Sequence, residues 1–414
     1  MTFKKIITKI HLWLGLLSGL VVFVIGMTGC CLAFEEEIKS IVYAHRLNVE
    51  FQDGMKPLPL SQTFEIAQNA LGKEIPIKEM FLGNGNDNSY AFGRYQHRNS
   101  DGIWYWDKIT YYKFVYINPY SGEILGFNDE RLEAFYVITM LHVSLLLELE
   151  IGTTIVAWST VLFIILLISG LILWWPRNKK ELKVNTWFRW KSTTRWKRKN
   201  YDLHNIVGFY IMFLALIIAL TGLIWSFKWV NNSIQWLANG GALEKKERII
   251  YQSDTTIVGS QNVLDIIYKQ MRAQLPEARM YNIFLPSDSL GTIRARANSY
   301  DRTKNLHLRF DQYTGDMIAV DRWEDKTNGE KVRDYNFDIH TGAVGGIVGK
   351  TIAFFVSLFS ASLPVTGFLI WWGRRRKKRK KPHSQTTAHS AGKHSHQPKP
   401  MRVRPKIKTP SSTD

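Results

Sequence analysis

Four long apolar stretches interrupt an otherwise mixed pattern along the 414 residues. Each holds about 20 apolar residues, the length at which a helix crosses about 30 Å of hydrocarbon. They lie at roughly residues 11–33, 153–175, 204–226 and 350–372. In the intervening segments, 57–130 and 260–322, a helix-like stretch precedes alternating apolar residues and Gly-containing turns, which is typical of a helix followed by a β-hairpin. The pattern predicts four transmembrane helices and two small α+β modules.

The same order of features occurs twice. His11 and His204 each begin a span, and each is followed by a Gly four residues later and by a Thr-Gly pair at the far end. The segments after His142 and His340 also match. Their matching positions are Gly152 and Gly349, Gly170 and Gly367, and Trp174-Trp175 and Trp371-Trp372. We interpret the chain as two tandem repeats of the same orientation, related by a pseudo-twofold axis along the membrane normal.

The formal net charge of +19 is concentrated at three places. Half of the 54 Lys and Arg residues lie near the N-terminus, in the linker from Arg177 to Lys199, and after Gly373. With four spans, all three places fall on one side of the membrane. The positive-inside rule then puts both termini and the linker in the cytoplasm and the two long connections outside. Orientation and attraction to anionic lipid account for the excess without nucleic acid; docking of an acidic electron donor is the alternative.

The two cysteines, Cys30 and Cys31, are adjacent, so the outer modules are expected to fold without disulfides. A competing interpretation is a lipoprotein signal peptide ending before Cys30, whose cleavage would remove His11. The Thr-Gly pair that precedes Cys30 recurs at Thr221-Gly222, deep in the chain, where no signal peptidase acts. The recurrence favours a structural role for the pair.

Four of the 11 histidines occupy matching positions of the two repeats. The topology places His11 and His204 near the inner face and His142 and His340 near the outer face. Two facing imidazoles at one depth are the axial ligands that a six-coordinate haem iron needs. Without a Cys-x-x-Cys-His motif, covalent c-type attachment is excluded. We therefore predict two bis-His b-type haems; the alternative is that the four rings only reach lipid headgroups.

Other residues near these histidines carry weaker expectations. Gly15 and Gly208 lie one turn from a histidine and would either admit a flat macrocycle or serve helix packing. Residues 142–175 are too long for one straight crossing, so we expect His142 on a short interfacial segment that bends into the span. A cluster of aromatic residues is either a ligand-binding surface or the packing face of a β-hairpin; it consists of Trp104, Tyr105, Trp106, Tyr111 and Tyr112. Three basic residues, Arg131, Arg333 and Lys350, either pair with haem propionates or are solvated surface charges.

The segments YINPYSGEILG (116–126) and RFDQYTGDMIA (309–319) resemble the closing hairpin of PepSY domains. The His-x3-Gly span, the Leu-His opening of the second span and the final Trp-Trp resemble the PepSY-associated transmembrane family, over nearly the whole chain up to about residue 375. The resemblance implies a bacterial inner-membrane di-haem reductase that reduces ferric siderophores at the periplasmic face.

We therefore expect an α-helical membrane protein with four transmembrane helices in two tandem repeats, each repeat carrying a periplasmic α+β PepSY-like domain. The expected segments are transmembrane helix 1 (1–34), periplasmic domain 1 (35–134), an interfacial segment with transmembrane helix 2 (135–176), a basic cytoplasmic linker (177–200), transmembrane helix 3 (201–229), periplasmic domain 2 (230–336), transmembrane helix 4 (337–373) and a disordered basic cytoplasmic tail (374–414).

The expected activity is that of a haem-dependent oxidoreductase passing electrons to a ferric siderophore or other iron(III) chelate and releasing iron(II). No G-x-G-x-x-G follows a strand and no Walker loop occurs, so the donor is external: a quinol, or a cytosolic flavin reductase at the basic linker. One alternative is a non-enzymatic PepSY regulatory or binding protein without haem. Another alternative is a transporter. This interpretation is disfavoured because the spans contain no discontinuous helices and no buried acidic residues.

Overall fold

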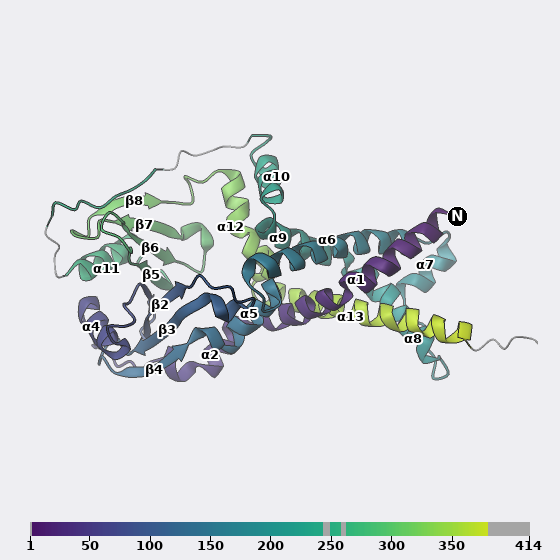
Figure 1. The fold of residues 1–414 in the computed structure, drawn as a ribbon, viewed down its shortest axis with the longest axis horizontal. Helices are drawn as coiled ribbons and strands as arrows, with labels where there is room; N and C mark the ends of the chain where they lie inside the picture. Colours follow the sequence, from purple (N-terminus) through teal and green to yellow (C-terminus); the bar gives the residue numbers. More distant parts are fainter. Residues whose placement is uncertain (1, 243–248, 258–261, 380–414) are drawn as a thin grey trace, which may run out of the picture. The chain divides into compact units, whose positions relative to one another are not determined.

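The computed structural model describes residues 2–242, 249–257 and 262–379, and the basic tail at 380–414 lies outside these residues. Within them, four helical segments are long and apolar enough to cross a membrane, as the hydrophobic pattern predicts. They are Phe3–Leu32, Leu149–Trp174, Trp196–Ser226 and Ala343–Arg375. These correspond to α1 (Phe3–Leu32), α6 (Leu149–Trp174), the run of α8 (Trp196–Asp202), the π-turn η3 (Leu203–Val207) and α9 (Gly208–Ser226), and η5 (Ala343–Gly345) with α13 (Gly346–Arg379). The chain is a multi-pass membrane protein (Figure 1).

The spanning helices pack through small residues and a narrow apolar core. A Cβ atom at Gly26 of α1 would lie 2.9 Å from Cβ of Ala361 in α13, so only glycine permits this approach. Such contacts take the place of a hydrophobic driving force, which lipid does not supply between helices. The buried core of the bundle consists of Val22, Phe163, Leu167, Ala215, Ala219 and Val356.

The two long connections form one antiparallel sheet. The first connection contributes α2 (Glu35–Val42), α3 (Ala44–Leu47), α4 (Leu60–Leu71), β1 (Glu79–Gly83), β2 (Tyr90–His97), η1 (Tyr105–Lys108), β3 (Ile109–Ile117), β4 (Ile124–Asp129) and η2 (Glu130–Leu132). The second contributes α10 (Lys228–Ala238), α11 (Val263–Gln274), β5 (Met280–Phe284), β6 (Ile293–Asn298), η4 (Arg302–Lys304), β7 (Leu306–Phe310) and β8 (Met317–Asp321). The strand order is β4-β3-β2-β1-β5-β6-β7-β8. The sequence predicts two modules; in the structure, pairing of β1 with β5 makes them one sheet.

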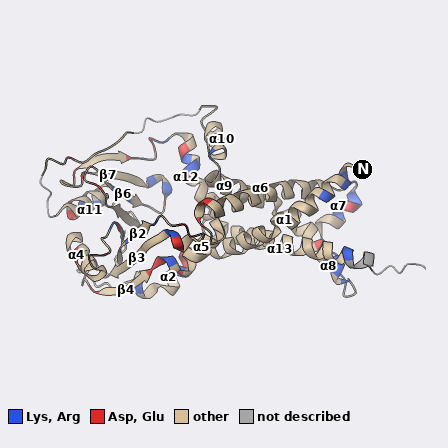
Figure 2. Cartoon of the chain, in the orientation of Figure 1, with Lys and Arg blue, Asp and Glu red and all other residues tan. Residues whose placement is uncertain are grey.

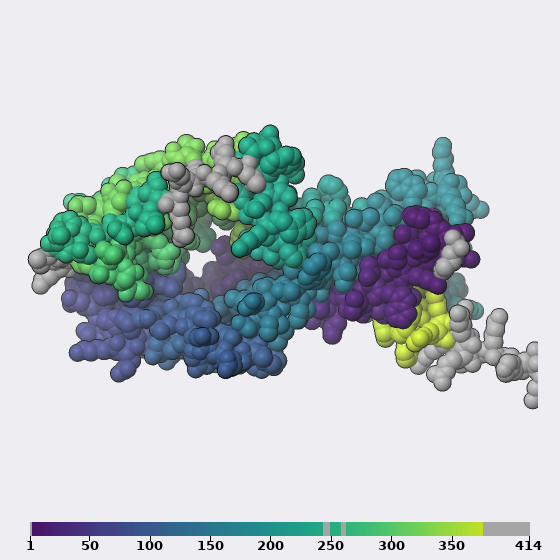
Figure 3. All heavy atoms as spheres, turned by 45° about the horizontal axis from the view of Figure 1, so that its top comes forward, coloured from purple at the N-terminus to yellow at the C-terminus, as the bar shows by residue number. Residues whose placement is uncertain are grey.

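Helices α4 and α11 cover one face of this sheet (Figure 1). Their apolar sides pack on alternate strand residues, and the largest fully buried side chains, such as Phe92, Tyr281 and Phe310, lie in this layer. Ser61 of α4 donates to Asp265 of α11, which links the two helices across the layer. Toward the helical bundle, Figure 3 shows a hollow in the surface between the green strands of the second half and the blue strands of the first.

Two short helices connect the sheet to the spans: α5 (Ala134–Ser144) and α12 (Asn328–Thr341). Leu145 and Leu146 have φ of 57° and 65° and end α5 before α6 begins, and Gly342, with φ of 79°, ends α12. A Cβ at Gly152 or Gly349 would lie 2.1 Å from the carbonyl oxygen of Ser144 or Gly342. The matched glycines therefore allow each span to start against the end of the short helix before it.

At the other end of the bundle, the linker between the second and third spans contains α7 (Lys179–Thr186) and α8. Figure 2 shows Lys and Arg gathered there, beside the start of α1. Lys4 donates to the carbonyl of Trp175, and Tyr210 donates to the carbonyl of Thr186. The basic linker and the N-terminal basic residues thus share the end of the bundle away from the sheet.

Candidate functional site

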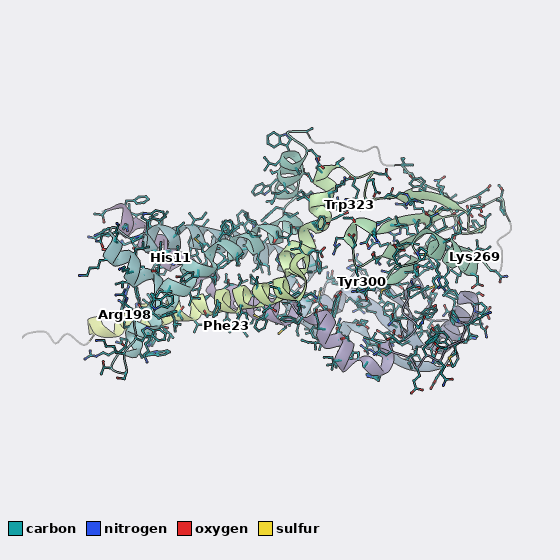
Figure 4. All side chains as sticks on the ribbon, turned by 180° about the vertical axis from the view of Figure 1, so that it is seen from behind. His11, Phe23, Arg198, Lys269, Tyr300 and Trp323 are labelled. Carbon is teal, nitrogen blue, oxygen red and sulfur yellow. The ribbon has the colours of Figure 1, made fainter. Side chains whose placement is uncertain are left out.

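The four histidines at matching positions meet in two pairs. The ring centroids of His11 and His204 are 6.3 Å apart, with the ring planes at 85°. Those of His142 and His340 are also 6.3 Å apart, at 71°. Figure 4 labels His11 within the bundle, toward the end that carries Arg198, whereas the second pair lies on α5 and α12 beside the sheet. The sequence predicts both pairings.

Each histidine is fixed by a hydroxyl of a neighbouring helix through its Nδ1 atom. The Nδ1–hydroxyl distances are 2.8 Å from His11 to Ser169, 2.9 Å from His142 to Thr28, 2.9 Å from His204 to Thr366 and 3.0 Å from His340 to Thr221. Every one of these bonds joins two helices of the same half of the chain. The two rings of each pair, by contrast, come from different halves.

The hydroxyl groups determine which ring nitrogen carries the proton. Thr28 donates its own hydroxyl proton to the carbonyls of Val24 and Ile25, one turn earlier in α1. Ser169, Thr221 and Thr366 do the same within their helices. A hydroxyl whose proton is already shared in this way accepts a hydrogen bond from Nδ1–H. The neutral imidazole therefore keeps its lone pair on Nε2, the form in which histidine ligates a metal.

A glycine follows each of these hydroxyl residues and receives the histidine ring. A Cβ at Gly170 would lie 3.4 Å from Cε1 of His11, and one at Gly29 would lie 3.5 Å from Cε1 of His142. The closest approach is at Gly367, where a Cβ would lie 3.2 Å from Cε1 of His204. The repeated Thr-Gly pairs thus have a physical role: the hydroxyl orients the ring and the glycine leaves space for it.

The spacing of each pair fits two axial ligands on one metal. With a metal–nitrogen bond of about 2.0 Å, and a ring centroid about 1.2 Å behind the nitrogen, two imidazoles on opposite sides of one ion have centroids about 6.4 Å apart. In the described residues, no group of three or more His, Cys, Asp or Glu side chains could hold a metal ion. A haem requires only the two axial ligands from the protein, because its macrocycle supplies the other nitrogens.

An asparagine braces one histidine of each pair. Asn200 precedes His204 by one turn and donates to the carbonyl of Thr366, the residue whose hydroxyl holds that histidine. Asn336 precedes His340 by one turn and donates to the carbonyl of Thr221 in the same way. Both asparagines are buried. The matching pentapeptides are NYDLH (200–204) and NFDIH (336–340), a signal that the sequence analysis missed.

The aspartates of these two pentapeptides are also paired. Asp202 accepts from Arg198 and from the indole N–H of Trp190. Asp338 forms an ion pair with Arg302 of η4, which ties α12 to the sheet. Each braced histidine therefore lies two residues after a carboxylate whose charge is already balanced by an arginine.

Several weaker expectations have a structural explanation. Tyr105 and Tyr112 pack against Tyr136 of α5, with ring centroids 5.8 and 5.0 Å apart, so the aromatic run includes a packing face for the His142 helix. Arg131 pairs with Asp129 in its own turn, and Lys350 pairs with Glu36 and Glu37. Arg333 lines a cavity beside Trp225. Gly349 serves the turn described above.

Gly15 and Gly208 behave differently from the packing glycines. A Cβ at Gly15 would lie 3.7 Å from Leu166, and one at Gly208 would lie 3.5 Å from Leu363, which are ordinary contact distances. Packing of the helices alone therefore does not require glycine at either position. Both lie one turn from a paired histidine, on the same side of the helix.

The chain was compared with curated proteins and with protein-family models. No functionally curated protein matches the chain. The sequence model of the PepSY-associated TM region matches residues 8–374, which is nearly the whole length and includes all four histidines. The chain belongs to the family of the PepSY-associated TM region.

Proposed function

We propose that this chain is a di-haem electron-transfer protein of a bacterial inner membrane. In this proposal, electrons pass from the cytoplasmic side or the quinol pool to a periplasmic iron(III) chelate such as a ferric siderophore, which releases iron(II). The protein would thus be a membrane-bound ferric-chelate reductase. The two halves would be tandem repeats, each with one PepSY-like portion of the shared sheet.

The observation that carries the proposal is the geometry of the two histidine pairs. Both have the same centroid separation of 6.3 Å, although one pair lies in the spans and the other on short connecting helices. Hydrogen bonds of the same kind hold Nδ1 of all four rings. Interfacial histidines that merely reach lipid headgroups need neither the fixed tautomer nor the matched spacing.

A haem at each pair supplies reversible one-electron chemistry when bound. His11 and His204 would hold the inner group, and His142 and His340 the outer one. The hydroxyl partners fix the ring orientation and increase the basicity of Nε2. The glycines Gly15 and Gly208 leave the adjacent helix faces flat, where a planar group requires space.

The charge distribution supports an orientation in which the N-terminus and the linker are cytoplasmic. Lys and Arg gather at the end of the bundle with α7 and α8, as the positive-inside rule expects for that side (Figure 2). The inner pair would then accept electrons from a quinol or from a flavin reductase at the linker. The outer pair lies beside the sheet, where an iron chelate would arrive.

The testing experiment counts haem in protein purified in detergent. We expect a reduced-minus-oxidised spectrum of low-spin b-type haem and close to two haems per chain by pyridine haemochrome quantification. The variant His204→Ala should lose the inner haem and keep the outer one, and His340→Ala should do the reverse. The exposed His97 on β2, changed to Ala, is the matched control and should keep both.

Two outcomes would overturn the proposal. One is well-folded protein, made with ample haem supply, that contains no haem; the regulatory interpretation would then lead. The other is haem content that does not change when His204 or His340 is replaced. A third result is a protein that contains both haems but reduces no iron(III) chelate. This result would support the haem sites and overturn the proposed acceptor.

A further inference from the structure

The open face of the second half of the sheet carries three arginines. Arg294 and Arg296 lie on β6, where they alternate with the buried residues Ile293, Ala295 and Ala297, and Arg309 lies on the neighbouring strand β7. Because side chains alternate between the faces of a strand, all three point away from the layer that α11 covers. Together they line a cavity of about 170 Å³ with Phe284, His307 and Asp321.

Two of these arginines lie directly opposite each other in the sheet. Arg294 and Arg309 are direct partners in the register of β6 and β7. Like charges directly opposite each other destabilise a sheet. Within the described residues none of the three arginines forms an ion pair, although Glu79 and Asp321 flank the cluster. An anion between the guanidinium groups would relieve the repulsion.

Aromatic rings hold the arginines in place. The guanidinium carbons of Arg294 and Arg296 lie 5.8 and 5.5 Å from the ring centroid of Phe284, and that of Arg309 lies 5.2 Å from Tyr251. Such cation–π contacts favour ordered side chains that still present their N–H donors. An ordered guanidinium binds a carboxylate with two parallel hydrogen bonds.

The matching face of the first half has a different composition. The positions that pair on β2 and β3 hold Ala91 with Tyr116 and Gly93 with Phe114. Ala91, Phe114 and Tyr116 pack with Leu47 of α3 in a small apolar core. The first half therefore closes this face, whereas the second half leaves it open and basic. A need for solubility alone does not explain three arginines around a cavity that a single carboxylate, Asp321, also lines.

The cluster lies next to the helix of the outer histidine pair. His307, which pairs with Arg296 across the strands, interacts with Lys326 and with Asp334 of α12. Burial, together with the charges of Lys326 and Arg296, lowers the pKa of His307. Asp334 also lines a second cavity, of about 400 Å³, together with Trp225, whose ring centroid is 5.2 Å from that of His340.

We propose that Arg294, Arg296 and Arg309 form a binding site for an anionic, carboxylate-bearing iron(III) chelate. This inference rests on the proposed function, because it names the charge class of the acceptor. The arginines would bind the ligand carboxylates and hold the chelate beside α12. Binding itself involves no electron transfer, so the site can be tested separately from the haems.

The test uses gallium(III) citrate, which has the charge and donor groups of its iron(III) counterpart but is not reduced under these conditions. Its binding to the purified full-length protein is measured by calorimetry, and haem is counted on the same sample. We expect the double variant Arg294→Gln/Arg309→Gln to bind at least tenfold more weakly. The control, Arg272→Gln at an exposed position of α11, should bind as the wild type does.

The outcomes separate the two proposals. Equal binding by the double variant and the wild type, with both haems present, overturns the arginine site and leaves the proposed function intact. Arginine-dependent binding in protein without haem supports the site and removes the electron-transfer role. Equal affinity for a neutral gallium(III) trihydroxamate would overturn the selectivity for anions. Arginine-dependent binding to vesicles of anionic lipid, without binding of gallium citrate, would replace the chelate with the membrane surface.

Discussion

The two halves of the chain form the same contacts to the histidine rings but differ in the residue that lies one helical turn before each histidine. In both halves a hydroxyl fixes Nδ1 and a glycine receives Cε1. In the second half, Asn200 or Asn336 adds a hydrogen bond to the same Thr. In the first half, the residues one turn before His11 and His142 are Ile7 and Ile138, which donate no such side-chain bond.

The difference means that each pair combines a braced histidine with an unbraced one. Each histidine is tied within its own half but faces a ring from the other half, so the separation of the rings depends on how the halves pack. The brace fixes the second-half ring to its neighbouring helix. The first-half ring has no asparagine of this kind beside it and is the more adjustable member of the pair.

The largest expected effect is therefore at a hydroxyl of the first half. Thr28→Val leaves Nδ1–H of His142 without its hydroxyl acceptor, which costs about 1–3 kcal/mol for a buried donor. Loss of an orienting partner typically lowers metal affinity about 10- to 100-fold. We expect Thr28→Val to lose the outer haem during dilution or competition with apomyoglobin.

Thr221→Val should have a smaller effect on the same haem. Asn336 still donates to the backbone carbonyl at position 221, and the carbonyl of Ile218 lies 3.0 Å from Nδ1 of His340. Thr28→Ser, which keeps the hydroxyl, should restore retention. Equal losses from the two valine variants, or no rescue by serine, would contradict the proposed difference between the halves.

The Thr-Gly pairs show what a sequence can and cannot predict. The apolar runs predict the spans, and the recurrence of a histidine with these pairs, together with the order of the spans, predicts which rings meet. Their partners were not predictable, because Thr28 meets His142 only after the chain has passed through the whole first connection. The brace is not predictable from hydropathy, because Asn200 falls at the end of the predicted linker and Asn336 at the end of the second connection, each just before a predicted span.

The second prediction concerns the brace itself. Asn336 is 1% exposed, and its Oδ1 atom has no hydrogen-bond partner among the described residues. Replacing it with the similarly sized Leu removes this unsatisfied acceptor, so the free energy of unfolding should change by less than about 1 kcal/mol. Haem retention at the outer site should nevertheless fall about tenfold, because α12 is no longer tied to Thr221.

Position 138 of the first half offers the matched control for the brace. Ile138→Leu, at the equivalent turn of α5, should leave retention of the outer haem unchanged. Asn200→Leu should weaken the inner haem and leave the outer one intact. A loss of folding in Asn336→Leu together with unchanged haem affinity per folded molecule would show that the asparagine serves stability alone.

The sheet could be predicted only in part. Alternating apolar residues and Gly turns located the hairpins, but the join between β1 and β5 depends on edge strands that neither half defines by itself. The basic face had a readable signal, Arg-x-Arg at 294–296 and His-x-Arg at 307–309. Its meaning required the register, because only the pairing of Arg294 with Arg309 brings the charges together.

The smallest expected effect is at the glycines beneath the rings, where the two halves differ by a few tenths of an ångström. A Cβ at Gly367 would lie 3.2 Å from Cε1 of His204, which is too close, whereas one at Gly29 would lie 3.5 Å from Cε1 of His142. The braced ring cannot move away easily, so Gly367→Ala should cost about 1 kcal/mol and weaken inner haem binding about fivefold. Gly29→Ala should be nearly neutral, because the ring of His142 is unbraced and a Cβ at position 29 would lie at an ordinary contact distance from it. Haem titration of both variants measures the two losses of affinity separately. An equal loss of haem affinity at both sites would mean that the brace does not limit movement of the ring.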